Sequence, residues 1–256
     1  VTPGQNPTSS GLAVSADLSS IGGASSQPFY NDGTNGDAVA GDGTFSFVAT
    51  VGAVPSGLKS LPASITDAQG RSGFTSIALT VAELLPIGTI QSSVADGTDG
   101  TLSRSPFAAA SPTSNSAGTT QVAVKAVVTQ KTLARSSSNA LQNGIFLQNT
   151  AATADTDPNS SDGIFVFMGA FNNLRRADGG PAYIPQVGDE IVLTGRVSEF
   201  FNFTQLSADL FVQPVVRSGV NLAETPAFDV NPPDNLADAN RYWERREGMR
   251  GTVPAG

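Results

Sequence analysis

Three stretches decide the fold: NGIFLQNT (143–150), DTDPNSSDGIFVFMG (155–169) and VGDEIVLTGRVSEFFNFTQL (187–206). Each contains a run of apolar and β-branched residues, and turn-forming Gly, Asn, Asp and Pro separate the runs. This pattern predicts β-strands joined by tight connections. With QVAVKAVVTQ (121–130) before them and LFVQPVVR (210–217) after them, they give five or more strands in one connected order, which fits a small closed barrel.

The residues before this segment predict a second β-module. Four runs alternate apolar and polar residues with the period of half-buried strands: LAVSADL (12–18), TFSFVATV (44–51), KSLPASITDA (59–68) and TSIALTVA (75–82). Turn clusters separate them at the spacing typical of a β-sandwich. We therefore expect an all-β chain with a sandwich over 1–82, a linker at 83–86, a barrel over 87–225 and, over 226–256, a truncated extension that starts a further domain.

Composition excludes several kinds of site. The 256 residues include no cysteine, so disulfides and thiolate metal sites are excluded, and no histidine, the commonest general base near neutral pH. The 22 carboxylates against 14 lysines and arginines give a net charge of −8, which repels polyanions at long range. No run approaches the ~20 apolar residues of a membrane span. The Gly-, Ser-, Thr- and Asn-rich composition is typical of an exported bacterial surface or extracellular protein.

Two acidic loops are candidate Ca²⁺ sites. In NDGTNGDAVAGDG (31–43), glycines allow turns that fold oxygen ligands inward, and the candidate ligands are Asp32, Asn35, Asp37 and Asp42. In the loop at 155–162, carboxylates alternate along an extended backbone, and the candidates are Asp155, Asp157 and Asp162. The alternative for the first loop is that Asp and Asn cap successive turns through their own backbone amides. The alternative for the second loop is that Pro158 and Ser160–Ser161 form an ordinary hairpin connection.

The order of the segments resembles a known arrangement. IGTIQ (87–91), VAVKAVVTQ (122–130), the three stretches above and YWERREGMRGTV (242–253) are similar to the OB-fold-like region that precedes the catalytic domain of large bacterial extracellular nucleases of the endonuclease/exonuclease/phosphatase superfamily. NDGTNGDAVAGDGTFSF (31–47) and SLPASITDAQGRSGFTSIALTV (60–81) resemble bacterial Ig-like modules. The resemblance implies an Ig-like sandwich followed by an OB-like barrel. The family's catalytic domain relies on histidine, so the resemblance implies a nuclease parent whose catalytic domain lies downstream in the same polypeptide.

An OB-type barrel binds single strands by stacking bases on aromatic side chains in a basic groove. The candidate contacts here are Lys125, Arg175, Arg176, Arg196, Phe200, Phe201 and Phe203, with Phe146, Phe165 and Phe167 nearby in the sequence. We expect half of the phenylalanines to fill the core, because Phe165 and Phe167 share one strand face while Ile164 and Val166 share the other. The adjacent Phe200 and Phe201 cannot both point inward, so one of them is exposed or caps a barrel end.

Three further features have simpler interpretations. The carboxylates of Asp189, Glu190 and Glu199 are expected to be solvated rather than to form a general acid/base pair. The polar insert from Ser92 to Thr120 predicts a surface loop. ANRYWERREG (239–248) predicts a short solvated helical turn that Tyr242 and Trp243 hold against a domain surface.

These features favour a non-catalytic accessory region of a secreted multidomain nuclease or phosphodiesterase, which it positions on extracellular DNA or on a surface polymer. The alternative is a structural or adhesive extracellular protein that self-associates through sheet edges into an array or filament. A third interpretation is a phosphoesterase that uses carboxylate metal sites.

Overall fold

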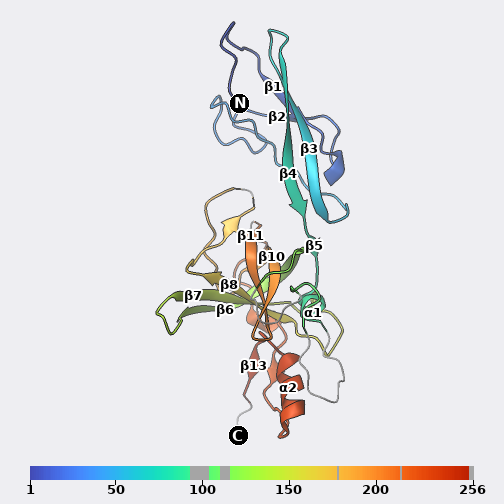
Figure 1. The fold of residues 1–256 in the computed structure, drawn as a ribbon, viewed down its shortest axis with the longest axis vertical. Helices are drawn as coiled ribbons and strands as arrows, with labels where there is room; N and C mark the ends of the chain where they lie inside the picture. The colour runs from blue at the N-terminus through green and yellow to red at the C-terminus, as the bar shows by residue number, and fades with distance from the viewer. Residues whose placement is uncertain (93–103, 110–115, 178, 214, 254–256) are drawn as a thin grey trace. The chain divides into compact units, whose positions relative to one another are not determined.

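The computed structural model describes residues 1–92, 104–109, 116–177, 179–213 and 215–253 (Figure 1). Its regular structure is mostly β, so the chain is all-β as the alternating apolar runs predict. Contacts divide it into two compact units, Val1–Ala82 and Glu83–Gly256. None of the described helices has the length and apolar character needed to cross a membrane. Most of the polar insert predicted between Ser92 and Thr120 lies outside the described residues.

The first unit contains one four-stranded antiparallel sheet. Its strands, in spatial order, are β2 (Gln27–Phe29), β1 (Ala13–Ala16), β3 (Gly57–Thr66) and β4 (Ser72–Val81). Of the strand predicted at 44–51, only Ser46 pairs, in an isolated β-bridge with Tyr30. Phe47 packs partly buried against the core, and the rest of the run forms no strand pairing with the described residues. The Ig-like assignment of this unit therefore stays a prediction.

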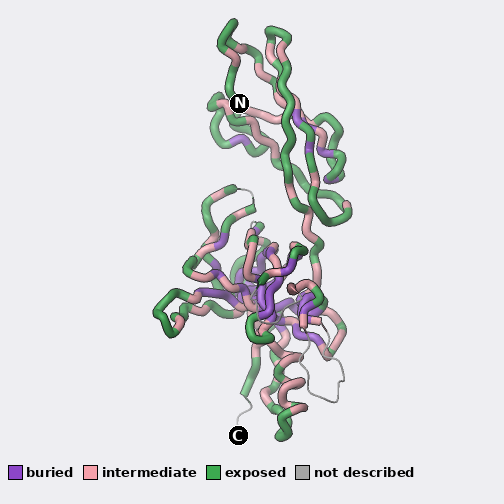
Figure 2. Tube along the Cα trace, in the orientation of Figure 1, coloured by how far each residue is buried: buried purple, intermediate pink, exposed green. Residues whose placement is uncertain are grey.

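The core of the first unit is small. Five hydrophobic residues are buried: Ala16, Leu18, Ile21 in the 3-10 helix η1 (Ser19–Ile21), Leu61 and Ala63. Phe29, Phe47, Leu79 and Val81 are partly buried against them. In Figure 2 this unit is mostly exposed or intermediate, whereas buried residues gather in the second unit.

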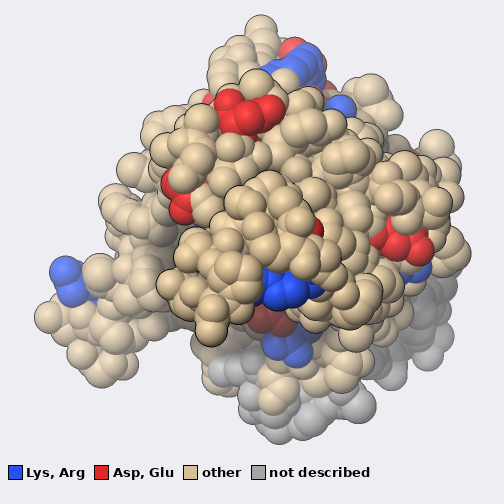
Figure 3. Space-filling model, turned by 90° about the horizontal axis from the view of Figure 1, so that it is seen from above, with Lys and Arg blue, Asp and Glu red and all other residues tan. Residues whose placement is uncertain are grey.

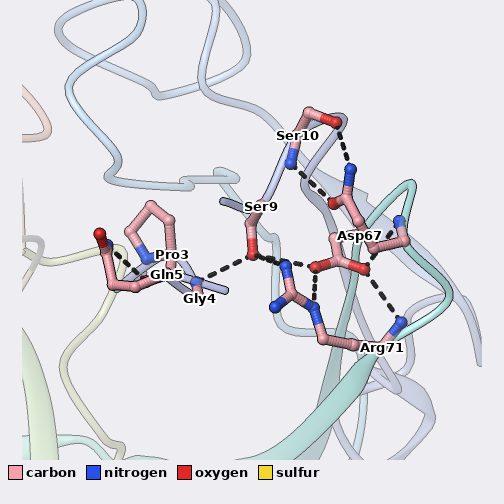
Figure 4. Close-up of polar contacts among 8 residues, drawn as sticks. Pro3, Gly4, Gln5, Ser9, Ser10, Asp67 and Arg71 are labelled. Atoms are coloured by element: carbon pink, nitrogen blue, oxygen red, sulfur yellow. Dashed lines mark hydrogen bonds and ion pairs between the residues drawn. The ribbon is translucent and has the colours of Figure 1, made fainter. Parts of the chain in front are cut away.

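A polar network fastens the turn between β3 and β4 (Figure 4). The Asp67 carboxylate accepts hydrogen bonds from Ser9 Oγ at 2.9 Å and from Arg71 Nε at 2.8 Å. It also accepts from the backbone N–H of Gln69 and of Arg71, at 3.0 and 2.9 Å. Burial raises the pKa of Asp67, but hydrogen bonds from Arg71 and Ser9 outweigh this and lower it overall. The ionised carboxylate thus ties the N-terminal segment to the hairpin.

Five strands of the second unit close into a ring. They are β6 (Gln121–Arg135), β7 (Leu141–Gln148), β8 (Gly163–Gly169), β11 (Phe203–Val212) and β10 (Glu190–Phe200). The ring closes because β10 pairs with both β11 and β6. β8 and β11 pair in parallel, and the other neighbours in the ring are antiparallel.

Short elements complete the second unit. They are β5 (Glu83–Leu84), α1 (Ile87–Gln91), β9 (Arg175–Arg176), η2 (Leu222–Glu224), β12 (Phe228–Asp229), α2 (Leu236–Glu244) and β13 (Gly251–Thr252). Residues 83–86, expected as a linker, include β5, which pairs in parallel with β6. The segment after residue 225 also contacts the barrel, because Gln148 Oε1 accepts from Arg250 N at 2.9 Å.

The barrel core is aliphatic. Its 17 buried residues include Ile164 and Val166 of β8, and no phenylalanine of the described chain is among them. Phe165 and Phe167 lie on the opposite face of β8 and are partly exposed. The expectation that half of the phenylalanines fill the core is therefore wrong. A five-stranded ring is narrow, and branched aliphatic side chains from every strand fill it.

Candidate functional site

Three phenylalanines form an aromatic row on the outside of the barrel. Phe146 of β7 and Phe165 of β8 are direct cross-strand partners, with ring centroids 5.0 Å apart. The Phe165 and Phe203 rings lie 5.7 Å apart across the parallel β8–β11 pair. The aromatic row, Phe146–Phe165–Phe203, thus crosses three strands whose hydrogen bonds fix the spacing of its rings.

Gly144 makes room for this row. It lies two residues before Phe146 on the same outward face of β7. A Cβ on Gly144 would stand 2.2 Å from Phe165 Cζ, which is far inside van der Waals contact. The Phe165 ring therefore occupies space that a side chain at position 144 would fill.

The aromatic row forms the floor of a groove of about 950 Å³, called here the central groove. Thr132, Ala134, Ser136 and Gln142 line it from the β6–β7 hairpin, and Phe200 lines it from the β10–β11 turn. Gln205 and Ser207 of β11 supply polar groups beside the rings. No charged side chain of the described chain lines it. The groove therefore offers flat apolar faces and neutral hydrogen-bonding groups.

The β10–β11 turn displays aromatic rings at one end of the groove. Phe201 and Asn202 both have positive φ, 53° and 63°, as a two-residue hairpin turn requires. Positive φ is unusual for a bulky residue and costs about 1–3 kcal/mol. Phe200 is 43 % exposed and Phe201 is 85 % exposed. Both rings therefore lie outside the core, where the sequence argument required only one.

The predicted basic contacts are dispersed. Lys125 Nζ lies 3.7 Å from Glu190, and Arg196 forms an ion pair with Asp209 at 2.7 Å. Arg175 lies over the Phe211 ring at 5.9 Å and lines a second hollow of about 600 Å³ that shares Phe167 and Ser207 with the central groove. Arg176, beside Arg175 on β9, lines neither hollow. The structure thus brings Phe200 and Phe203 together in one groove but does not gather the four cations there.

The carboxylates of Asp189, Glu190 and Glu199 are buried, with exposed fractions of 6 %, 2 % and 2 %, so the expectation that they are solvated is wrong. Glu190 accepts from Arg217 Nε at 2.8 Å, and this hydrogen bond, with help from Lys125, lowers its pKa against the effect of burial. Asp189 accepts from the Tyr183 hydroxyl at 2.5 Å. Lys125 lies on β6, whereas Tyr183 lies in the connection before β10 and Arg217 follows β11. These contacts therefore hold the connections against the strands of the barrel.

Glu199 and Glu247 meet beneath the β10–β11 turn. Glu199 Oε1 accepts from Ser105 N at 2.8 Å and from Thr204 Oγ1 at 3.1 Å, and Glu247 Oε1 accepts from Thr204 N at 2.9 Å. Burial, with the negative charges of Glu244 and Glu199, raises the pKa of Glu247 to about 8. Glu247 is therefore mostly protonated near neutral pH.

The first acidic loop is built from capped turns. Asp32 Oδ1 accepts from Thr34 N at 2.9 Å, Asp37 Oδ2 from Gly33 N at 2.7 Å, and Asp42 Oδ1 from Thr44 N at 2.7 Å. Asn35 sits at a positive φ of 52° and donates to Thr34 Oγ1. These contacts are the ones that the turn-capping interpretation describes, and Ca²⁺ binding stays a prediction.

The second acidic loop follows the same pattern. Asp155 Oδ1 accepts from Asp157 N and Asp157 Oδ1 from Asn159 N, both at 2.9 Å. Burial and the nearby Asp155 charge raise the pKa of Asp162 to about 6. In the part of the chain that the structure describes, no three carboxylates gather closely enough to hold a metal ion.

The surface drawn in Figure 3 carries charged side chains as small separate patches among uncharged ones. Comparison of the chain with protein-family models, with curated proteins and with solved structures finds no match in any of the three. The central groove is therefore interpreted from its own geometry.

Proposed function

We propose that the second unit is an OB-fold-like barrel that binds unpaired nucleic acid in the central groove, as a non-catalytic binding region of a secreted multidomain nuclease or phosphodiesterase. The observation that carries this proposal is the aromatic row, three rings spaced 5.0 and 5.7 Å apart on the floor of a groove whose described walls contain no charged side chain. Bases stack on such rings for about 1–3 kcal/mol each.

The position of the groove on the ring of strands supports the same proposal. In five-stranded OB barrels, ligands lie on the face of the second and third strands, between the loop joining the first two strands and the loop joining the last two. Here the corresponding elements are β7 and β8, the β6–β7 hairpin and the β10–β11 turn, and all four line the central groove.

The absence of charged side chains from the described walls of the groove sets the expected mode of binding. Each phosphate that a cation neutralises adds about 0.7 to the slope of log affinity against log salt for single strands. A groove that binds mainly by stacking therefore gives a shallow slope. The net charge of −8 also opposes long-range attraction, so we expect moderate affinity with little sequence preference.

The test is a titration of fluorescent oligothymidylate with the chain at low salt. Wild type should bind, Phe146→Ala should weaken binding about tenfold, and Phe74→Ala, at a phenylalanine of β4 that is 82 % exposed, should leave it unchanged. No binding at high protein concentration contradicts the proposal. Binding of a neutral oligosaccharide in place of the oligonucleotide contradicts it as well.

A second candidate function rests on β4 of the first unit. This strand of ten residues, SGFTSIALTV, pairs with β3 alone among the described strands and contains neither a charged residue nor proline. The opposite edge, β2, has three residues and includes Pro28. Long unguarded edges favour pairing with another strand. Self-association that Ala78→Lys abolishes, measured by light scattering, supports a structural or adhesive role, and a monomer at all concentrations contradicts it.

A further inference from the structure

A second groove adjoins the central groove at Phe203. This groove, called here the α2 groove, measures about 400 Å³ and is lined by Phe201 and Asn202 of the β10–β11 turn and by Asn240 and Trp243 of α2. Phe203 lines both grooves. An extended ligand on the aromatic row can therefore continue past Phe203 without leaving the surface.

The α2 groove presents an indole and a guanidinium that are both held in place. Trp243 is 47 % exposed, and its ring packs edge-on against Tyr242 at 5.1 Å and Phe228 at 6.5 Å. Arg246 lies over the Tyr242 ring at 4.0 Å and donates to the Tyr242 carbonyl oxygen at 3.1 Å. A fixed indole takes a stacked base, and a fixed guanidinium matches the oxygens of a phosphate.

The described lining of the α2 groove contains both signs of charge. Between Leu236 and Arg250 there are four arginines and three carboxylates. Two of the carboxylates, Glu244 and Glu247, line the groove. Because burial raises the pKa of Glu247 to about 8, that group is mostly neutral near pH 7. With Glu247 neutral, the described lining of the α2 groove has one cation, Arg246, and one carboxylate, Glu244, so it is less acidic than the chain as a whole, whose net charge is −8.

We infer that Trp243 and Arg246 form an additional subsite for unpaired nucleic acid, in which Trp243 stacks a base beyond Phe203 and Arg246 contacts the phosphate backbone. This inference rests on the proposed function of the barrel. It makes affinity depend on ligand length, because a short oligonucleotide fills the aromatic row alone whereas a longer one also reaches Trp243.

Intrinsic fluorescence tests this directly, because Trp243 is the single tryptophan of the chain. The full chain is titrated with oligothymidylates of about four and about twelve nucleotides, which span most of the site sizes of OB barrels. The longer oligonucleotide should quench the Trp243 emission and bind about tenfold more tightly or better. The shorter one should bind, as followed by its own label, with little quenching.

Variants separate the two contacts. Trp243→Ala should weaken binding of the longer oligonucleotide about tenfold and leave the shorter one within about twofold of wild type. Arg246→Gln should lower the salt slope for the longer one by about 0.7. Leu236→Ala, an exposed position of α2 that does not line the groove, is the matched control and should change neither.

The outcomes distinguish this inference from the proposed function. If both oligonucleotides bind but Trp243 is not quenched and Trp243→Ala has no effect, the subsite is contradicted and the central groove stands. If neither oligonucleotide binds at low salt, the proposed function is contradicted and the inference falls with it.

Discussion

The two units use the same kind of strand to build very different interiors. In the first unit five buried hydrophobic residues support a four-stranded sheet, and Phe29 and Phe47 supplement them from the side. In the described part of the second unit, 16 buried aliphatic residues and Met168 form the core of a closed ring of strands. Closure buries one face of every strand in the ring, whereas the first sheet keeps a free edge and a partly uncovered face.

This difference bears on where binding groups can be displayed. No phenylalanine of the described strands is buried in the barrel core, although Phe107 and Tyr183 pack partly buried against it from connecting segments. The phenylalanines of β7, β8 and β11 are therefore available on the outer face. The first unit uses two of its phenylalanines to supplement a small core, and it relies on polar ties such as the Asp67 network. Stability and the proposed ligand binding thus depend on different residues in the barrel.

The largest expected effect comes from truncating the two cores. Leu206→Ala should lower the free energy of unfolding of the barrel by about 2–5 kcal/mol, because Leu206 is fully buried in a closely packed ring. Leu61→Ala in the first unit should cost less, because its partly exposed neighbours can close around the gap.

Urea unfolding followed by Trp243 fluorescence measures the barrel alone, and hydrogen exchange of the β3 and β4 amides measures the first unit. Each substitution should act on its own unit. A shift of the Trp243 transition by Leu61→Ala contradicts the independence of the two cores.

The next largest expected effect is a pH dependence of the barrel's stability. The folded chain holds the Glu247 proton up to about pH 8, whereas the ordinary value is 4.5. Between these values the folded state binds a proton that the unfolded state has lost, so stability falls as pH rises. Glu247→Gln should remove this loss and be more stable than wild type at pH 9 by on the order of a few kcal/mol.

Denaturant midpoints from Trp243 fluorescence at pH 5 and pH 9 check this. Glu83→Gln, at an exposed carboxylate of β5, is the control and should follow wild type at both pH values. Equal pH dependence of stability in wild type and Glu247→Gln contradicts the assignment of this pH dependence to Glu247.

A smaller expected effect tests whether oligonucleotide affinity depends on the aromatic row rather than on the aliphatic core. Gly144→Ala places a methyl group against the Phe165 ring and 2.6 Å from the Val166 carbonyl oxygen, so it should cost about 1–3 kcal/mol of stability as the ring and the neighbouring backbone shift. The aromatic row should then lose about tenfold in oligonucleotide affinity. Gly73→Ala on β4 is the matched control, because nothing lies within 4 Å of its added Cβ. Unchanged affinity in Gly144→Ala contradicts the role of the row.

The smallest effect concerns the first unit. The pKa of Asp67 is lowered in the folded chain, so its contribution to stability is present above the unfolded pKa and is lost as pH falls through the lower, folded value. Asp67→Asn should flatten this acid dependence, measured by hydrogen exchange in β3 and β4. Asp42→Asn, in a loop away from the hairpin, should retain it.

Much of the fold could be predicted because strands depend on local pattern. The runs at 121–130, 144–149 and 162–169 all lie in strands. The number of strands predicted a closed barrel, but the pattern did not show that β10 and β6 are the pair that closes it, because they are far apart in the sequence. Glu83 and Leu84 lie shortly before Pro86 and were expected in a linker. They form β5 instead, which pairs in parallel with β6. The five residues IGTIQ are too few for their pattern to distinguish a helix from a strand, and they form the helix α1.

The site was predicted in part. Period-two alternation correctly separates Phe165 and Phe167 from Ile164 and Val166, but it does not say which face points inward. The FFNF run predicted Phe200, Phe201 and Phe203 as candidate contacts, and these residues line the central groove or the α2 groove. Gly144 and Gln205 were missed, because their roles depend on cross-strand neighbours. For Gly144 the sequence did contain one signal, because a glycine inside a strand, two residues before a phenylalanine, indicates close approach of a neighbouring group.

The most direct test of the account compares two adjacent residues of β8. Ile164→Ala should lower the stability of the barrel by about 2–5 kcal/mol while the folded fraction keeps its oligonucleotide affinity. Phe165→Ala should lower affinity by about tenfold or more and cost less stability than Ile164→Ala, about 1–3 kcal/mol from its two lost ring contacts. The opposite result, in which Phe165→Ala unfolds the barrel and leaves affinity unchanged, contradicts the division between an aliphatic core and an aromatic binding face.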